Sequence, residues 1–257
     1  MTSSFTIKQI MDSWYDHADE VDIVTASLNE VRTTLHLEDV KSCVAVGSGH
    51  GSIELPFLQL CMPNVLEFTA VEPDLESAAA MSKNLAERLP NVVSVVCQEM
   101  VQQWRDPDQP VDAVLLFHVL YYLNAQHRLA LYKRLYDTVV KSGGFVFIII
   151  HPHYISGEPS AYCRLFQLLV KSFKQGYECI TDREILEAVS SVGFELCYER
   201  MYHCQLNVEN PDDAFMSLFL GGDGRGVNES VRQAAKEVFG DFKHVHHDIW
   251  LGIFRKP

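Results

Sequence analysis

From residue 43 onward, short apolar runs alternate with longer segments of helical period. Runs with the length and composition of strands occupy 43–47, 66–71, 92–97, 112–117 and 145–150, and helical periodicity occupies 51–61, 74–89 and 125–140. Two further strand patterns follow at 194–208 and 248–254. Strands that alternate with helices form βαβ units, whose right-handed crossovers cover both faces of a parallel sheet. The pattern therefore predicts an α/β fold with a seven-stranded, mostly parallel sheet and helices on both faces.

A glycine-rich loop follows the first predicted strand. Gly47, Gly49 and Gly51 are separated by one residue each, and the next strand pattern ends at Glu72. Glycine lets a ligand approach the backbone and tolerates unusual φ angles. A carboxylate at the end of the second strand can accept hydrogen bonds from two ribose hydroxyls. Because Ser52 stands where the dinucleotide pattern Gly-x-Gly-x-x-Gly needs its last glycine, the sequence predicts a nucleoside-binding crevice rather than a dinucleotide site.

A Gly-x-Gly-x-Gly loop with an acidic end to the second strand looks like the S-adenosylmethionine loop of class I methyltransferases. A narrower similarity runs in order through 46–55, 71–73, 118–123 and 179–182. Together these stretches resemble the histamine N-methyltransferase family. The resemblance implies a Rossmann-like class I methyltransferase fold with S-adenosylmethionine as cofactor.

By this resemblance the glycine loop and Glu72 would hold the cofactor at the carboxyl ends of the strands. After the third strand, a polar side chain and a backbone amide would meet the adenine while Met100 packs against its face. The residues expected to bind the cofactor are Gly47, Ser48, Gly49, Gly51, Glu72, Pro73, Gln98, Glu99, Met100 and Phe117.

The predicted catalytic residues are His118, Tyr121 and Tyr122. His118 interrupts an apolar segment at the end of the fourth strand, where it would face the methyl donor and accept a hydrogen bond or a proton. It stands where the family carries a glutamine that contacts substrate. The two tyrosines would wall the amine site by the same resemblance, offering ring faces to a flat ring or a cation.

The predicted substrate residues come from both ends of the chain. The family binds its amine with a glutamate in the N-terminal helices, for which Glu20 is the best candidate and Asp19 the next. His246 or His247 falls near a family asparagine with a similar role. The full set of predicted substrate contacts is Tyr15, Asp19, Glu20, His151, Tyr154, His246 and His247. The expected acceptor is a small amine or imidazole-containing, histamine-like metabolite.

We expect a single methyltransferase domain over 1–257. It would comprise an N-terminal helical lid at 1–40, a cofactor-binding core at 41–150, and a small helical substrate lobe with the last strands at 151–257. Within the last part, a helix is predicted at 160–174, Thr181 and Glu184 fit a capping box, and 221–226 is a glycine-rich connection.

Composition narrows the partners. The formal net charge of −13 and the lack of Lys and Arg clusters exclude nucleic acid and favour a cationic substrate. Seven cysteines without a Cys-x-x-Cys pair look like reduced core residues. The N-terminus lacks a signal segment and the strongest apolar run, 145–150, is too short to span a bilayer. We therefore expect a cytoplasmic protein without a membrane partner, and a monomer.

Three alternatives to an N-methyltransferase stay open. The first is a methyltransferase that acts on oxygen, sulfur or a protein side chain. The second is a protein that binds S-adenosylmethionine without catalysis, and the third is an oxidoreductase with a nucleotide cofactor. A metal is not expected: alternation places His244 and His246 on one side of an extended chain, but no cysteine or carboxylate set completes a tetrahedral site.

Overall fold

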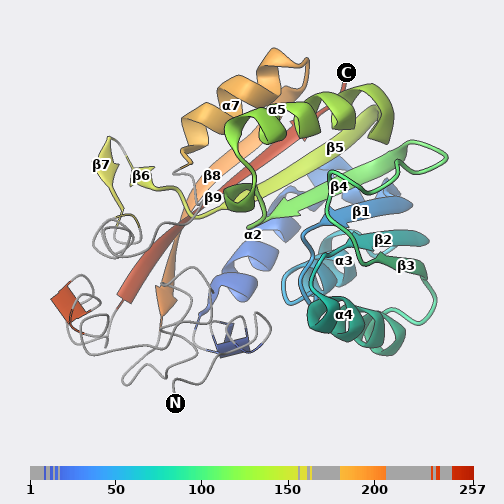
Figure 1. Ribbon diagram of the computed structural model, residues 1–257, viewed down its shortest axis with the longest axis horizontal. Coiled ribbons are helices and arrows are strands. Elements are labelled where there is room, and N and C mark those ends of the chain that lie inside the picture. Colours follow the sequence, from blue (N-terminus) through green and yellow to red (C-terminus); the bar gives the residue numbers. More distant parts are fainter. Residues whose placement is uncertain are drawn as a thin grey trace.

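The computed structural model describes residues 18–155, 157–160, 180–206 and 245–257, together with the single positions 9, 12, 13, 15, 16, 163, 233, 236 and 237 (Figure 1). At 206, 245 and 246 only the backbone is described. The predicted helix at 160–174, apart from Ser160 and Cys163, and the connection at 221–226 lie outside these residues. None of the helices described here is both long and apolar enough to cross a bilayer.

A seven-stranded sheet forms the centre of the fold (Figure 1). Its strands lie in the order β3 (Val93–Cys97), β2 (Glu67–Val71), β1 (Ser42–Val46), β4 (Val111–Phe117), β5 (Val140–Ile150), β9 (Val245–Arg255) and β8 (Glu195–Leu206). The pairs within β3-β2-β1-β4-β5 are parallel, whereas β9 is antiparallel to both β5 and β8. The predicted seven-stranded, mostly parallel sheet is confirmed.

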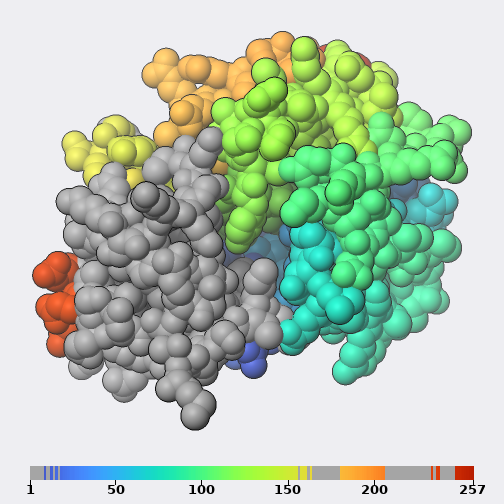
Figure 2. Space-filling model, in the orientation of Figure 1, coloured from blue at the N-terminus to red at the C-terminus, as the bar shows by residue number. Residues whose placement is uncertain are grey.

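Helices cover both faces of the sheet. One core cluster joins the sheet to α2 (Glu20–Leu35), α3 (Glu54–Cys61) and α4 (Leu75–Arg88), and a second joins it to α5 (Ala125–Arg134) and α7 (Asp182–Ser191). In the space-filling view α5 and α7 form the upper part of the molecule and α4 lies at the lower right (Figure 2). Shorter elements are η1 (Leu37–Asp39), η2 (Leu120–Tyr122), the π-turn η3 (Leu135–Val139) and the hairpin of β6 (Tyr154–Ile155) and β7 (Glu158–Pro159).

Strict alternation along β5 explains why its sequence is a continuous apolar run. Phe145, Phe147 and Ile149 belong to the first core cluster, and Val146, Ile148 and Ile150 belong to the second. A central parallel strand is buried on both faces, so every position from 145 to 150 is apolar.

Several predicted boundaries were wrong. β5 begins at Val140 rather than at 145, because Val140 pairs with Val111 across an irregularity in the β4–β5 register. The helix expected from 51 begins only at Glu54, after a turn at the end of the glycine loop. The helix expected over 125–140 is α-helical only to Arg134 and ends in the π-turn. Thr181 forms the predicted capping box: the Glu184 N–H donates to the Thr181 hydroxyl at 3.1 Å, and the Thr181 N–H donates to the Glu184 carboxylate at 3.0 Å.

The strand order reverses between β1 and β4. From β1 the chain continues outward to β2 and β3, and from β4 it continues in the opposite direction to β5. The connecting loops therefore diverge at the carboxyl ends of β1 and β4. In open α/β sheets ligands bind at this kind of crevice.

Candidate functional site

The glycine loop is held against the end of β2 and against Val119. The Gly47 N–H donates to the Val71 carbonyl at 2.7 Å, and a Cβ on Gly47 would lie 2.3 Å from Val119 Cγ2. Gly49 has a φ of +52° and differs in its surroundings, because a Cβ there would meet no atom within 4 Å. The backbone at Gly49 thus borders open space, as it must where a ligand approaches closely.

Glu72 follows β2 and joins this loop to the next one. Its Oε2 accepts a hydrogen bond from the Gly49 N–H at 2.8 Å and its Oε1 accepts one from the Asp74 N–H at 2.9 Å. Burial raises the pKa of Glu72, and the two backbone donors offset part of this effect. Each carboxylate oxygen keeps a further lone pair, so Glu72 can still accept two hydrogen bonds from a ligand.

A cavity of about 440 Å³ lies between the glycine loop, Glu72 and the end of β4. Its lining combines apolar and polar groups, namely Tyr15, Val46–His50, Ser52–Glu54, Val71–Asp74, Ser77, Met100–Gln102, Phe117–Val119, Tyr122 and Leu123. Ser48 and Ser77 belong to the lining but are only 3% and 1% exposed. Their hydroxyl oxygens are buried and have no hydrogen-bond partner among the residues that the structure describes.

Most of the predicted cofactor residues line this cavity, and three do not. Gln98 and Glu99 lie outside the lining, and the neighbouring Val101 and Gln102 take their place. Gly51 is also absent from the lining; a Cβ there would lie 2.8 Å from Met81 Sδ, so this glycine allows close packing against α4. Sequence reasoning missed Ser77, which only the path of α4 brings to the cavity.

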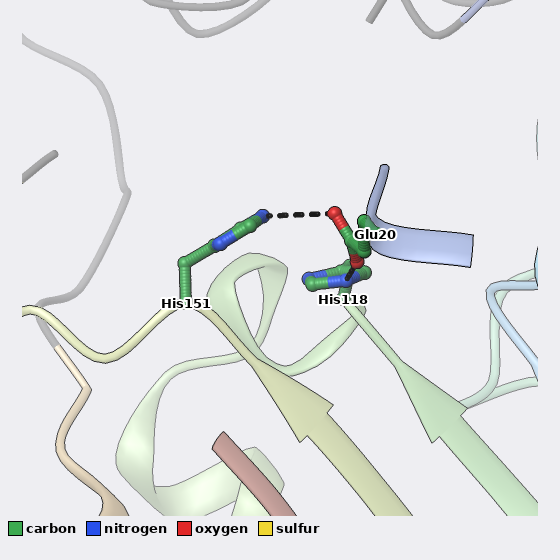
Figure 3. A group of neighbouring side chains, drawn as sticks. All are labelled: Glu20, His118 and His151. Atoms are coloured by element: carbon green, nitrogen blue, oxygen red, sulfur yellow. Dashed lines mark hydrogen bonds and ion pairs between the residues drawn. The ribbon is translucent and has the colours of Figure 1, made fainter. Parts of the chain in front are cut away.

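A second group of side chains adjoins the cavity at the carboxyl ends of β4 and β5 (Figure 3). His118 follows β4, His151 follows β5, and Glu20 begins α2. A carboxylate oxygen of Glu20 is hydrogen-bonded to His118 Nε2, and the other lies 3.8 Å from His151 Nε2 and 3.5 Å from His247 Nε2. Glu20 is fully buried, and His151 and His247 are 8% and 6% exposed.

The surroundings fix the charge of Glu20. Burial favours its neutral form, but the charge and hydrogen bond of His118, with smaller effects of His247 and His151, outweigh burial and hold the pKa of Glu20 well below its ordinary value. His151 behaves in the opposite way: burial and the neighbouring His118 lower its pKa well below the ordinary range, despite Glu20. The group therefore combines a buried carboxylate with at least one neutral imidazole.

Tyr121 supports this group from behind. It is 2% exposed and does not line the cavity. Its hydroxyl accepts a hydrogen bond from the His151 N–H and lies 3.3 Å from His118 Nδ1. Tyr122 takes the position predicted for both tyrosines, since it lines the cavity and is 65% exposed. His118 itself has a left-handed φ of +53°, an unusual conformation for a residue with a side chain.

The remaining predicted substrate residues are spread more widely. Tyr15 lines the cavity. Asp19 instead binds the backbone of β8, where its carboxylate accepts from the Gln205 N–H at 2.7 Å. Tyr154 lies in β6, away from the cavity lining. The side chain of His246 falls outside the described residues.

Comparison with known proteins agrees with this architecture. The family profile described as "Methyltransferase domain" matches residues 43–144. No curated protein sequence matches the chain.

The solved structures that resemble the protein share its fold at low sequence identity. A candidate methyltransferase from Bacillus halodurans has a TM-score of 0.65 at 14% identity, over 90% of this chain and 99% of that one. A cyclopropane synthase from Mycobacterium tuberculosis has a TM-score of 0.61 at 14% identity, over 90% and 83%. An N-methyltransferase from Bradyrhizobium japonicum, solved with S-adenosyl-L-homocysteine, has a TM-score of 0.52 at 12% identity, over 89% and 86%.

Residues 43–144 thus match a methyltransferase domain, and the fold around them is shared with solved methyltransferase structures.

Proposed function

We propose that the protein transfers a methyl group from S-adenosylmethionine to a nitrogen of a small amine or imidazole-containing metabolite. The observation that carries this proposal is the position of His118, which both lines the cofactor cavity and is hydrogen-bonded to the buried carboxylate of Glu20. The methyl donor and a negatively charged acceptor site would thus adjoin one another. Methyl transfer is an in-line displacement, so this alignment is the main requirement.

On the cofactor side, Glu72 would accept hydrogen bonds from the ribose hydroxyls and the glycine loop would pass beneath the cofactor. Ser48 and Ser77 belong to the same cavity lining. Met100 and Phe117 add apolar contacts in the cavity lining. We assign cofactor binding to these residues rather than to Gln98, Glu99 and Gly51.

On the acceptor side, the charge favours a nitrogen compound. A buried carboxylate attracts a cation or an imidazole N–H, and it would repel an anionic acceptor such as a phenolate or thiolate. Tyr122 would provide a ring face beside it. The resemblance of 118–123 to the histamine N-methyltransferase family supports the same class of acceptor, although histidines at 118 and 247 change its substrate contacts.

The test is transfer of labelled methyl from S-adenosylmethionine to a panel of imidazole amines, other amines, amino acids, phenols and thiols. Product on nitrogen is expected, and Glu20→Gln should lower turnover while cofactor affinity stays unchanged. Glu30→Gln is the matched control, because Glu30 is an exposed residue of the same helix. Product only on oxygen or sulfur would contradict the proposed acceptor, and cofactor binding without transfer to any compound would contradict catalysis.

A further inference from the structure

The group of Glu20, His118 and His151 has the composition of a metal site. One carboxylate oxygen and two imidazole nitrogens, one from each residue, lie within 4.8 Å of one another. They come from three separate parts of the chain, and both histidine side chains meet the carboxylate of Glu20 (Figure 3). His247 Nε2 lies 3.5 Å from the carboxylate and is a fourth nitrogen beside them.

Two of the distances in this group are of the size that tetrahedral coordination gives. Donors bound to one ion by bonds of about 2.1 Å lie about 3.4 Å apart. Glu20 Oε2 lies 3.8 Å from His151 Nε2 and 3.5 Å from His247 Nε2, whereas His118 Nε2 is hydrogen-bonded to the other oxygen, Oε1. Imidazole rings bound to one ion at the tetrahedral angle have centroids about 5.2 Å apart. The His151–His247 centroid distance of 5.1 Å agrees with this value, and the His118–His151 distance of 4.5 Å is shorter.

Hydrogen bonds behind the rings orient the nitrogen atoms. His151 Nδ1 lies 3.3 Å from the carbonyl of Asp248, which can only accept, so Nδ1 carries the proton. In the neutral ring the lone pair is then on Nε2, which faces Glu20. His118 Nδ1 has the Tyr121 hydroxyl at 3.3 Å as its partner behind the ring. Metal-binding histidines commonly have such a partner on the second nitrogen.

A proton on His118 Nε2 makes the hydrogen bond to Glu20 in the metal-free protein, and a bound ion would replace that proton. Imidazole nitrogen with carboxylate oxygen is a ligand set for zinc, iron or cobalt rather than for magnesium or calcium.

We propose that Glu20, His118 and His151 bind a divalent transition-metal ion of the zinc class, with His247 as a neighbouring residue that supports the site. Three protein ligands leave one coordination position, which an acceptor would fill with a neutral lone-pair donor, because the bound ion offsets the charge of Glu20 that otherwise attracts a cation. If His118 binds the ion, it does not accept a proton, which is the role predicted for it from the sequence. The metal site lies on the acceptor side of the proposed methyl-transfer site. Binding of the acceptor to the ion rests on the proposed function, whereas binding of the ion itself does not.

The experiment measures metal binding to the full chain without cofactor or acceptor, so the metal site and the methyl transfer can each fail alone. Protein stripped with chelator is titrated with Zn²⁺ by calorimetry, and Co²⁺ is used to record the absorption of a tetrahedral site. We expect one ion per chain with a visible Co²⁺ spectrum that Zn²⁺ abolishes. Glu20→Gln and His151→Ala should each weaken Zn²⁺ binding by more than about 100-fold.

His127→Ala is the matched control, because His127 is an exposed histidine of α5 and is not one of the proposed ligands. It should bind Zn²⁺ like the unmodified protein. Equal Zn²⁺ affinity in all four proteins, or no tetrahedral Co²⁺ spectrum in the unmodified chain, would overturn the proposal. The Co²⁺ spectrum needs no substitution, so the proposal can still be refuted if a variant fails to fold.

Discussion

The carboxylate of Glu72 gives the sharpest test of the cofactor site. Its two oxygens already bind the N–H groups of Gly49 and Asp74, at 2.8 and 2.9 Å, and this holds both oxygens at the cavity. Two ribose hydroxyls would add two hydrogen bonds to a charged acceptor, each worth about 1.5 to 3 kcal/mol. Since about 1.4 kcal/mol corresponds to a tenfold change in affinity, Glu72→Ala should weaken cofactor binding by at least about 100-fold.

Glu72→Gln should lose less, because the amide keeps one acceptor oxygen. The measurement is calorimetric titration with S-adenosyl-L-homocysteine, which carries the same adenosine and cannot react. Glu76→Ala is the control: Glu76 is an exposed glutamate in the first turn of α4 and does not line the cavity. The cofactor assignment of Glu72 is refuted if Glu72→Ala binds as tightly as Glu76→Ala while both variants remain folded.

Three further substitutions test cofactor binding in the cavity and the stability of the fold. Gly49→Ala should weaken cofactor binding strongly in calorimetry. Gly157→Ala is the control, because Gly157 also has a positive φ and open surroundings but lies outside the cavity lining, so this change should lower only stability. Equal cofactor affinities of the two variants would contradict a close ligand at Gly49. Burial raises the pKa of Glu54 to about 8, compared with about 4.3 in the unfolded chain, so the folded state favours the protonated carboxyl. The contribution of Glu54 to the free energy of unfolding is therefore present below about pH 4.3 and is lost as the pH rises from about 4.3 to about 8. Glu54→Gln should therefore gain stability relative to the unmodified protein over this pH range. If urea unfolding gives the same difference in unfolding free energy between the two proteins at every pH, the prediction is wrong. Asp112→Ala should lose at least about 1.5 to 3 kcal/mol of unfolding free energy, because it removes the oxygen that accepts backbone hydrogen bonds of 2.8 and 2.9 Å at the start of β1. The exposed Asp108→Ala should lose almost none.

Local pattern was sufficient for much of the cofactor half of the protein. Residues of the cavity lining lie within a few positions of an apolar run, as Gly47 does after β1 and Glu72 after β2. Parallel strands place their carboxyl ends at one edge, so the sequence order of these residues already implied a common crevice. The capping box at Thr181 was equally predictable, because its hydrogen bonds join residues only three positions apart.

Where two predicted candidates were close in sequence, only tertiary structure could choose between them. Glu20 and Asp19 are adjacent, yet one joins the histidine group and the other binds the backbone of β8. Tyr121 and Tyr122 divide in the same way, because the turn at η2 buries the first and directs the second into the cavity lining. Adjacent residues point their side chains in very different directions, and position in the sequence alone does not show which of the two faces the site.

By itself, then, the sequence determined the α/β sheet, the glycine loop and the acidic strand end, because these follow from short-range periodicity and from the chemistry of single residue types. Only the tertiary structure decided that Glu20 meets His118, 98 residues away, and that His151 and His247 join them. The sequence offered no carboxylate set to complete a site with His244 and His246, because local spacing shows only residues that are neighbours along the chain. The carboxylate that faces His247 lies on α2, and the packing of α2 against the carboxyl ends of β4 and β5 brings it there.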